Sequence, residues 1–221
     1  MSERSAASRA RKIKLLLFDV DGVLTDGKLF IFPAPAGTVQ SALDQRALAQ
    51  SAKYAGQPGF GFHSPASSVQ SLVEAKGFHA HDGTSISLAR LGGIKTGLIT
   101  KRISETVALR ARDLRLEYIR QGIHDKRTCF EEVIKEEGIE PREAAFVGDD
   151  IIDLPAMRAA GLAIAVKNAR TEVKQEAHYV TPNAGGDGAL RDAVEFILKS
   201  QGKWKEILEA YIGERSPGRS I

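Results

Sequence analysis

Two aspartates stand two positions apart, directly after an apolar run near the start of the chain. Residues 15–18 are Leu-Leu-Leu-Phe, and Asp19 and Asp21 follow within the string DVDGVLTDG. A short apolar run that ends in a glycine-containing turn is typical of a buried strand followed by a loop. Parallel strands present their carboxyl ends to ligands, so acids placed here lie where such a sheet does its chemistry. One aspartate alone would fit an ordinary polar turn equally well, but the full string favours catalysis.

A pair of carboxylates can transfer a phosphoryl group. An ionised carboxylate can attack phosphorus if a divalent cation and fixed positive charge reduce the repulsion between the two anions. A second carboxyl can protonate the leaving alcohol and later accept a proton from the attacking water. The string resembles the first motif of the haloacid dehalogenase-like phosphatases, which implies that Asp19 is the nucleophile and Asp21 the general acid.

Two later residues could hold the phosphate and neutralise the nucleophile. Thr100 ends an apolar run, and Ser104 is the better cap for the helix that follows, which leaves the Thr100 hydroxyl for a phosphate oxygen. Lys126 stands shortly after a Gln-Gly turn, at the start of an amphipathic pattern. Most lysines are solvated surface charges, but this position resembles the third motif of the same family, in which the ammonium neutralises nucleophile and phosphate.

Three carboxylates follow a further apolar run at residues 144–147, namely Asp149, Asp150 and Asp153. Acids packed at one strand end repel one another strongly unless a cation lies among them, and oxygen-only ligands favour Mg²⁺. A calcium loop does not fit, because the alternating acids and terminal glutamate of that loop are missing. Asp150 or Asp153 is expected to hold Lys126 or a bound water. The expected metal ligands are Asp19, Asp21 and Asp149.

The elements that position these residues alternate between strand and helix patterns. Apolar runs near residues 13–18, 94–99, 116–119, 144–147, 162–166 and 178–181 predict strands, and helical patterns separate most of them. This alternation predicts an α/β fold with a doubly wound, Rossmann-like parallel sheet. With 221 residues and 43% apolar content, the chain can bury the core of a single domain.

The segment at about residues 33–71 has a different composition. It is rich in Ala, Ser, Gln, Gly and Pro, so it offers little material for a core. Within it, QSALDQRALAQSAK could form a weak helix and GQPGFGFHSPASS resembles a loop. The interval between Thr100 and Lys126 is also too short for a lid domain. Because such phosphatases need a covered site, we expect a lid borrowed from another subunit and no separate cap domain.

The net charge of +3 comes from the amino terminus. Residues 1–12 predict a flexible basic arm ahead of a single domain at 13–221, with a low-complexity hairpin insertion at about 33–71. The arm has no aromatic residue, so we expect no nucleic-acid partner. Neither a signal peptide nor a membrane span is evident, which predicts a cytoplasmic protein without membrane contact. The single cysteine, Cys129, excludes internal disulfides and is expected in the core.

From about residue 13, the chain resembles the capless phosphatases that hydrolyse 3-deoxy-D-manno-octulosonate (KDO) 8-phosphate. The resemblance rests on DVDGVLTDG, KGFHAHDGTSISL, GLITKR, YIRQG, VGDDIIDLPAM and AHYVTPNAGGDGALRDAVEFILKSQGKW. It implies a magnesium-dependent phosphomonoesterase of lipopolysaccharide precursor synthesis that acts on a phosphorylated sugar acid through a phosphoaspartate. It also implies a homotetramer built by a hairpin after the first motif, with a tail that reaches a neighbour's site. The implied substrate contacts are His79, Ala80, His81, Asp82, Gly83, Arg102, Arg110, Lys126 and Asp150; for the two histidines, an ordinary turn role fits equally well.

The chain departs from this family in three places. Lys101 replaces the glycine of Thr-Gly-Arg, the hairpin connection is longer, and Asp187 replaces the arginine of Gly-Gly-Arg. Asp187 is expected to weaken binding of an anionic sugar acid. Another sugar acid or sugar phosphate therefore stays open as substrate. A receiver-like signalling domain is disfavoured because here the paired acids come first in the chain, and the intact set of acids argues against a non-catalytic binding or assembly protein.

Overall fold

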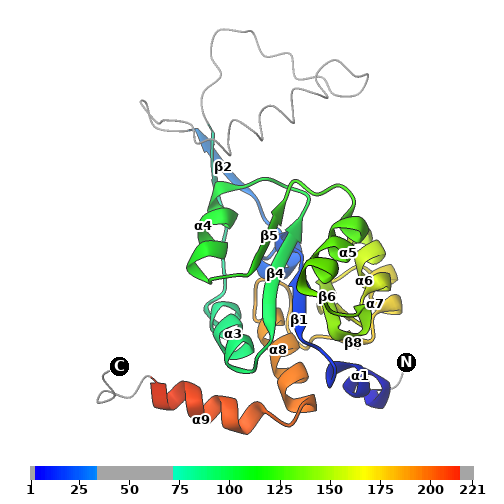
Figure 1. Cartoon of the computed structure of the whole chain (residues 1–221). Helices are drawn as coiled ribbons and strands as arrows, with labels where there is room; N and C mark the ends of the chain where they lie inside the picture. Colours follow the sequence, from blue (N-terminus) through cyan, green and yellow to red (C-terminus); the bar gives the residue numbers. More distant parts are fainter. Residues whose placement is uncertain (1–2, 34–71, 215–221) are drawn as a thin grey trace.

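A six-stranded parallel sheet forms the centre of the protein (Figure 1). The computed structural model describes residues 3–33 and 72–214. Strand order is β5-β4-β1-β6-β7-β8. All pairings between neighbouring strands of this sheet are parallel. The strands are β1 Leu15–Phe18, β4 Lys95–Thr100, β5 Tyr118–Gln121, β6 Ala144–Gly148, β7 Leu162–Ala165 and β8 Tyr179–Val180.

Helices cover both faces of this sheet (Figure 1). On one side α3, α8, α1 and α9 pack together, and on the other α5, α6 and α7 do so. Parallel strands covered in this way are buried on both faces, which explains why β1 is apolar throughout. The helices are α1 Glu3–Ala10, α3 Ala80–Leu91, α4 Glu105–Asp113, α5 Lys126–Glu137, α6 Leu154–Ala159, α7 Thr171–Glu176, α8 Ala189–Ser200 and α9 Trp204–Glu214, with short turns η1 Val20–Leu24, η2 Pro141–Glu143 and η3 Ile151–Asp153.

The position of β1 fixes where the chemistry can occur. Its neighbours are β4 on one side and β6 on the other, so the direction of strand order reverses at this point. Ligands of doubly wound sheets bind outside the carboxyl ends of the strands at such a reversal. The carboxyl ends of β1, β4 and β6 all lie there, with Asp19 just after β1, Thr100 as the last residue of β4 and Asp149 just after β6.

A separate two-stranded antiparallel sheet projects from the body (Figure 1). Its strands are β2 Phe30–Pro33 and β3 Leu72–Ala75, paired so that Ile31 lies opposite Glu74. All of β2 is exposed. The two strands thus flank the segment predicted as an insertion. Residues 34–71, including the stretch expected as a weak helix, lie outside the described part of the chain.

The predicted cap at Ser104 and the predicted core position of Cys129 are confirmed. Ser104 caps α4 by accepting a hydrogen bond from the Val107 amide at 3.3 Å. Gly138 ends α5 in the left-handed region with φ 69°, and Cys129 is buried. No cap domain is present in the described residues, and none of their helices is long and apolar enough to cross a membrane.

The prediction of a flexible basic arm is wrong for residues 3–10, which form α1. Ala6 and Ala10 are buried, and this helix packs against α8. The Arg9 guanidinium donates to the Gly161 carbonyl at 2.8 Å. Two alanines four positions apart lie on one face of a helix. Burial of this apolar face against the body keeps the segment folded as a helix in spite of its basic composition.

Candidate active site

A buried lysine joins two aspartates at the carboxyl ends of β1 and β6. The Lys126 ammonium lies 2.9 Å from Oδ2 of Asp19 and 2.6 Å from Oδ1 of Asp153. These three side chains are almost entirely buried. Burial lowers the pKa of Lys126, but Asp19 and Asp153 raise it overall, so the lysine stays protonated. The prediction that Asp150 or Asp153 would hold Lys126 is thereby decided in favour of Asp153.

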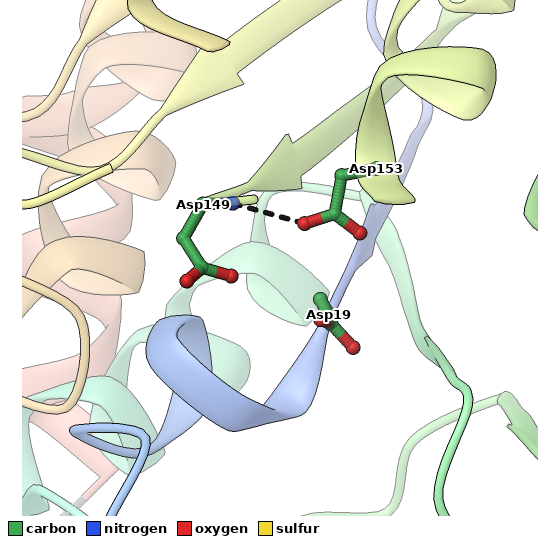
Figure 2. A group of neighbouring side chains, drawn as sticks. All are labelled: Asp19, Asp149 and Asp153. Carbon is green, nitrogen blue, oxygen red and sulfur yellow. Dashed lines mark hydrogen bonds between the residues drawn. The ribbon is translucent and has the colours of Figure 1, made fainter. Parts of the chain in front are cut away.

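Asp153 also organises the loop that carries Asp149. Its Oδ2 accepts hydrogen bonds from the backbone amides of Asp149, at 3.0 Å, and Asp150, at 3.3 Å (Figure 2). With Oδ1 bound to Lys126, both oxygens of Asp153 are in use. Asp153 therefore links Lys126 to the loop that carries Asp149 and Asp150.

The side chains of Asp19, Asp149 and Asp153 lie close together (Figure 2). Ligand oxygens from the three lie within 4.8 Å of one another. Oδ1 of Asp19 and Oδ1 of Asp149 are buried and make no hydrogen bond to another described residue. Two buried carboxylate oxygens without partners are costly unless a cation binds them, so the site fits a divalent cation held by Asp19 and Asp149.

The electrostatics of the acids lead to the same conclusion. Burial, with added repulsion from Asp153, raises the pKa of Asp19 to about 6. Burial and the charges of Asp153 and Asp19 raise the pKa of Asp149 to about 7. Without a cation, Asp149 is therefore only partly ionised near neutral pH, and Asp19 takes up a proton under mildly acidic conditions. A divalent cation would favour the ionised form of both.

Two glycines allow the acids to lie this close. Gly22 has φ 92°, and a Cβ on it would overlap the Asp149 carboxylate. A Cβ on Gly148 would overlap the Asp153 side chain. The glycines in DVDG and VGDD are therefore needed for space as well as for backbone conformation.

The Asp21 carboxylate is not one of the three that gather here, and it has charged partners of its own. Its Oδ1 accepts a short hydrogen bond from Lys76, and its Oδ2 lies 3.5 Å from Nε of Arg102. Among the described residues, the cluster suited to a metal consists of the other three aspartates. The Asp21 side chain thus lies outside the acidic cluster and is paired with two cations.

Sequence reasoning did not identify two residues at the base of the hairpin. Glu74 accepts hydrogen bonds from Arg102 at 2.6 Å and from the Ser104 hydroxyl at 2.6 Å. Lys76 has no exposed side-chain surface and contacts Asp21 and Glu74. Their spacing by two residues at the end of a strand is the signal that could have placed both on one face.

The remaining predicted catalytic residue is also where it was expected. Thr100 is the last residue of β4 and is 3% exposed. Its carbonyl accepts a hydrogen bond from the Ile123 amide at 3.0 Å, which fixes the strand end. Asp150 caps the turn η3 by accepting from the Ile151 amide at 2.8 Å.

The predicted substrate residues 79–83 form the start of α3. Asp82 is fully buried, and its two oxygens accept from the amides of Gly188 and Arg191, so it holds the start of α8. Arg110 packs against Gly83, where a Cβ would overlap the guanidinium, and lies over Phe78 at 5.8 Å. His79, Ala80 and His81 lie at the helix start, and the two histidine rings meet edge to face at 4.7 Å.

The two glycines before Asp187 contact the catalytic loop of their own chain. The Gly186 amide donates to the Val23 carbonyl at 2.9 Å, and a Cβ on Gly185 would overlap the Gly22 carbonyl. This segment therefore packs against the catalytic loop of its own chain. Asp187 itself is exposed, with Oδ1 3.9 Å from Nε2 of His79.

Comparison with known proteins identifies one consistent group of relatives. Residues 98–191 match the model of the haloacid dehalogenase-like hydrolase family. The chain is 32% identical over 199 residues to the 3-deoxy-D-manno-octulosonate 8-phosphate phosphatase KdsC of Escherichia coli K12, covering 90% of this chain and 86% of the relative.

Solved structures agree with this result. The phosphatase of the same name from Moraxella catarrhalis, in complex with magnesium, phosphate and KDO, is 30% identical with a TM-score of 0.74, covering 95% of this chain and 99% of that one. The cobalt-bound enzyme from Haemophilus influenzae is 27% identical with a TM-score of 0.69, covering 92% and 99%.

Proposed function

The chain belongs to the 3-deoxy-D-manno-octulosonate 8-phosphate phosphatases of the haloacid dehalogenase-like hydrolases, and on this basis we propose that it hydrolyses KDO 8-phosphate to KDO and phosphate. The observation that carries the proposal is the buried contact of Lys126 with Asp19 and Asp153 beside Asp149. Asp19 and Asp149 would hold Mg²⁺, which supplies positive charge for the phosphoryl group.

The side chains divide the reaction into two transfers. An oxygen of Asp19 forms a bond to phosphorus while the bond between phosphorus and the sugar oxygen breaks. Asp21 gives a proton to that oxygen as it leaves, then takes one from the water that attacks the phosphoaspartate. Lys126 stabilises the negative charge on Asp19 and the phosphoryl oxygens, and the Thr100 hydroxyl would hold one of those oxygens.

Substrate recognition would use the positive groups around this centre. Arg102 is partly exposed beside Asp21, and Arg110 lies against the start of α3. Guanidinium groups can bind a carboxylate through paired hydrogen bonds, which suits a sugar acid. His79, His81 and Asp150 are further candidates for contacts with the sugar, and Asp187 adds a negative charge that opposes the substrate carboxylate.

A substrate panel tests the assignment. Purified protein with Mg²⁺ should release phosphate from KDO 8-phosphate with a higher kcat/KM than from hexose phosphates, because only the sugar acid offers a carboxylate to the arginines. Phosphate release is measured across sugar acid phosphates and neutral sugar phosphates. A clear preference for a neutral sugar phosphate would exclude the named substrate but keep the phosphatase.

The hairpin supports a proposal about assembly. Alternation along β2 and β3 places Phe30, Phe32 and Val73 on one face, and all three are 40% or more exposed. The opposite face carries Glu74, which is bonded to the body. An exposed apolar face on a projecting hairpin is typical of a protein interface, so we infer a homotetramer assembled through it. A neighbouring subunit would then supply the lid over the site.

Substitution on this face tests the assembly. Phe32→Asp should dissociate the tetramer, because a buried charge without a partner opposes association. Val180→Asp is the matched control, since Val180 is 40% exposed on β8, the edge strand on the side of the sheet opposite β4 and β5. Light scattering on both variants and the wild type gives the masses. A monomeric wild type with full activity would rule out both the tetramer and the borrowed lid.

The enzyme's location follows from its proposed place in metabolism. Within lipopolysaccharide precursor synthesis, a phosphorylated, highly charged sugar acid does not cross membranes unaided. We therefore place the enzyme in the cytoplasm, where such a substrate would be made.

A further inference from the structure

Lys76 makes a buried ion pair that none of the roles described above uses. Its side chain comes from the residue that follows β3, and no part of it is exposed. The ammonium donates to Oδ1 of Asp21 and lies 3.7 Å from Oε1 of Glu74. A buried ammonium is costly unless it is paired, and here it is paired with the carboxyl assigned as the general acid.

The two oxygens of Asp21 have different surroundings. Lys76 occupies Oδ1 through a direct hydrogen bond. Oδ2 lies 3.5 Å from Nε of Arg102, whose Nη2 is committed to Glu74 at 2.6 Å. The hold on Oδ2 is therefore weaker, which leaves Oδ2 as the oxygen that can carry the transferred proton.

Lys76 is itself held in place by the same network. Glu74, two residues earlier and on the same face of the strand, accepts from Arg102 and Ser104, and its carbonyl accepts from the Thr106 hydroxyl at 3.1 Å. The end of β3 is thus fastened to the start of α4. This anchoring fixes where the Lys76 backbone lies relative to Asp21.

We propose that Lys76 is a positioning residue for the general acid: by holding Oδ1 of Asp21, it directs Oδ2 toward the oxygen of the leaving alcohol. This inference rests on the proposed function. The proton passes from Oδ2 to the sugar oxygen as the bond from phosphorus to that oxygen breaks, and the bonding electron pair stays on the oxygen. Lys76 exchanges no atom with the substrate.

Leaving groups of different acidity separate this role from a structural one. The oxygen of a sugar alcohol needs a proton to leave, whereas p-nitrophenolate leaves without one. Lys76→Met should therefore slow the single-turnover transfer from KDO 8-phosphate by about tenfold to a hundredfold, part of what a general acid contributes. With p-nitrophenyl phosphate, the first turnover should keep its wild-type rate and appear as a burst, because only the later attack of water needs Asp21.

Three variants complete the test. Lys76→Arg keeps the positive charge and should recover most of the lost rate, and Lys76→Gln gives a second neutral side chain if the methionine variant does not fold. Lys95→Met, which removes an ion-paired lysine at the opposite end of the sheet, should leave both rates unchanged. Rapid-mixing measurements of phosphate and p-nitrophenolate give the rates.

Several results would overturn the inference. An equal loss of the first-turnover rate with both esters would show a structural role. A raised KM with unchanged kcat would show that Lys76 binds substrate directly. Wild-type rates for the neutral variants would show that the ion pair is not used. A wild type that hydrolyses neither ester would overturn the proposed function and this inference together, whereas the other outcomes leave the function intact.

Discussion

Asp19→Asn is expected to abolish turnover, with kcat lowered at least about a thousandfold. An amide oxygen is a poor nucleophile and cannot form the phosphoaspartate, so both transfers are lost. Acid-quenched enzyme mixed with labelled substrate should carry covalent phosphate in the wild type and none in this variant. Asp21→Asn should be slowed by about a hundredfold or more, because it keeps the nucleophile but loses the acid.

An aspartate outside the site provides the control. Asp192 lies on α8 and bonds to Asn183, so Asp192→Asn should keep normal kinetics. Circular dichroism confirms that each variant is folded. If Asp19→Asn retained wild-type turnover, phosphoryl transfer through Asp19 would be ruled out.

Removal of Mg²⁺ should also abolish turnover and change how stability depends on pH. Burial, together with Asp153, raises the pKa values of Asp19 and Asp149 to about 6 and about 7. Both groups bind protons more tightly in the folded protein than in the unfolded chain. Their contribution to stability is therefore fully present below about pH 4 and is lost as the pH rises through 6 and 7.

Magnesium should reverse this loss, because it binds the ionised carboxylates. The melting temperature of metal-free protein should fall between pH 5 and pH 8, and added Mg²⁺ should raise it more at pH 8 than at pH 5. Asp149→Asn should show a smaller fall and a much smaller response to Mg²⁺. Thermal denaturation at both pH values, with chelator or with Mg²⁺, gives four melting temperatures for each protein.

One half-buried histidine contributes with the opposite sign. Burial lowers the pKa of His178, so its share of stability increases as the pH rises through its ordinary range. His178 contributes equally to the pH dependence of the wild type and of Asp149→Asn. Its contribution therefore cancels when the two pH dependences are subtracted. Two results would contradict the assignment of Asp19 and Asp149 as magnesium ligands. One is a melting temperature of the metal-free wild type that depends on pH no more than that of Asp149→Asn, and the other is full activity in the presence of chelator.

Prediction from the sequence succeeds at the places where an apolar run is followed directly by acids. β1 and β6 are apolar runs that end in Asp19 and Asp149, and their burial and meeting point follow from the rules of parallel sheets. Lys126 could be placed because it starts an amphipathic helix after a strand. Contacts within the site could not be assigned, so the choice between Asp150 and Asp153 required the structure.

The missed features depend on contacts between distant segments. Lys76 and Asp21 are brought together by the hairpin, and nothing in their local sequence indicates the pairing. The basic composition of the first twelve residues hid the buried face of α1 with Ala6 and Ala10. The contact of Gly185 and Gly186 with the chain's own catalytic loop was also missed, because it joins segments more than 150 residues apart.

The central place of β1 has a consequence for the synthesis of the protein. Leu15 pairs with Lys95 and with Ala144, so the first strand of the sheet to leave the ribosome is paired on both edges only after most of the chain has been made. At typical rates of translation, this interval is on the order of ten seconds. During that time an apolar strand with at least one free edge is available to chaperones or to other nascent chains. Because the nucleophile directly follows this strand, a truncated chain that lacks β6 has no assembled site, and recovery of activity after unfolding reports that the whole sheet has formed.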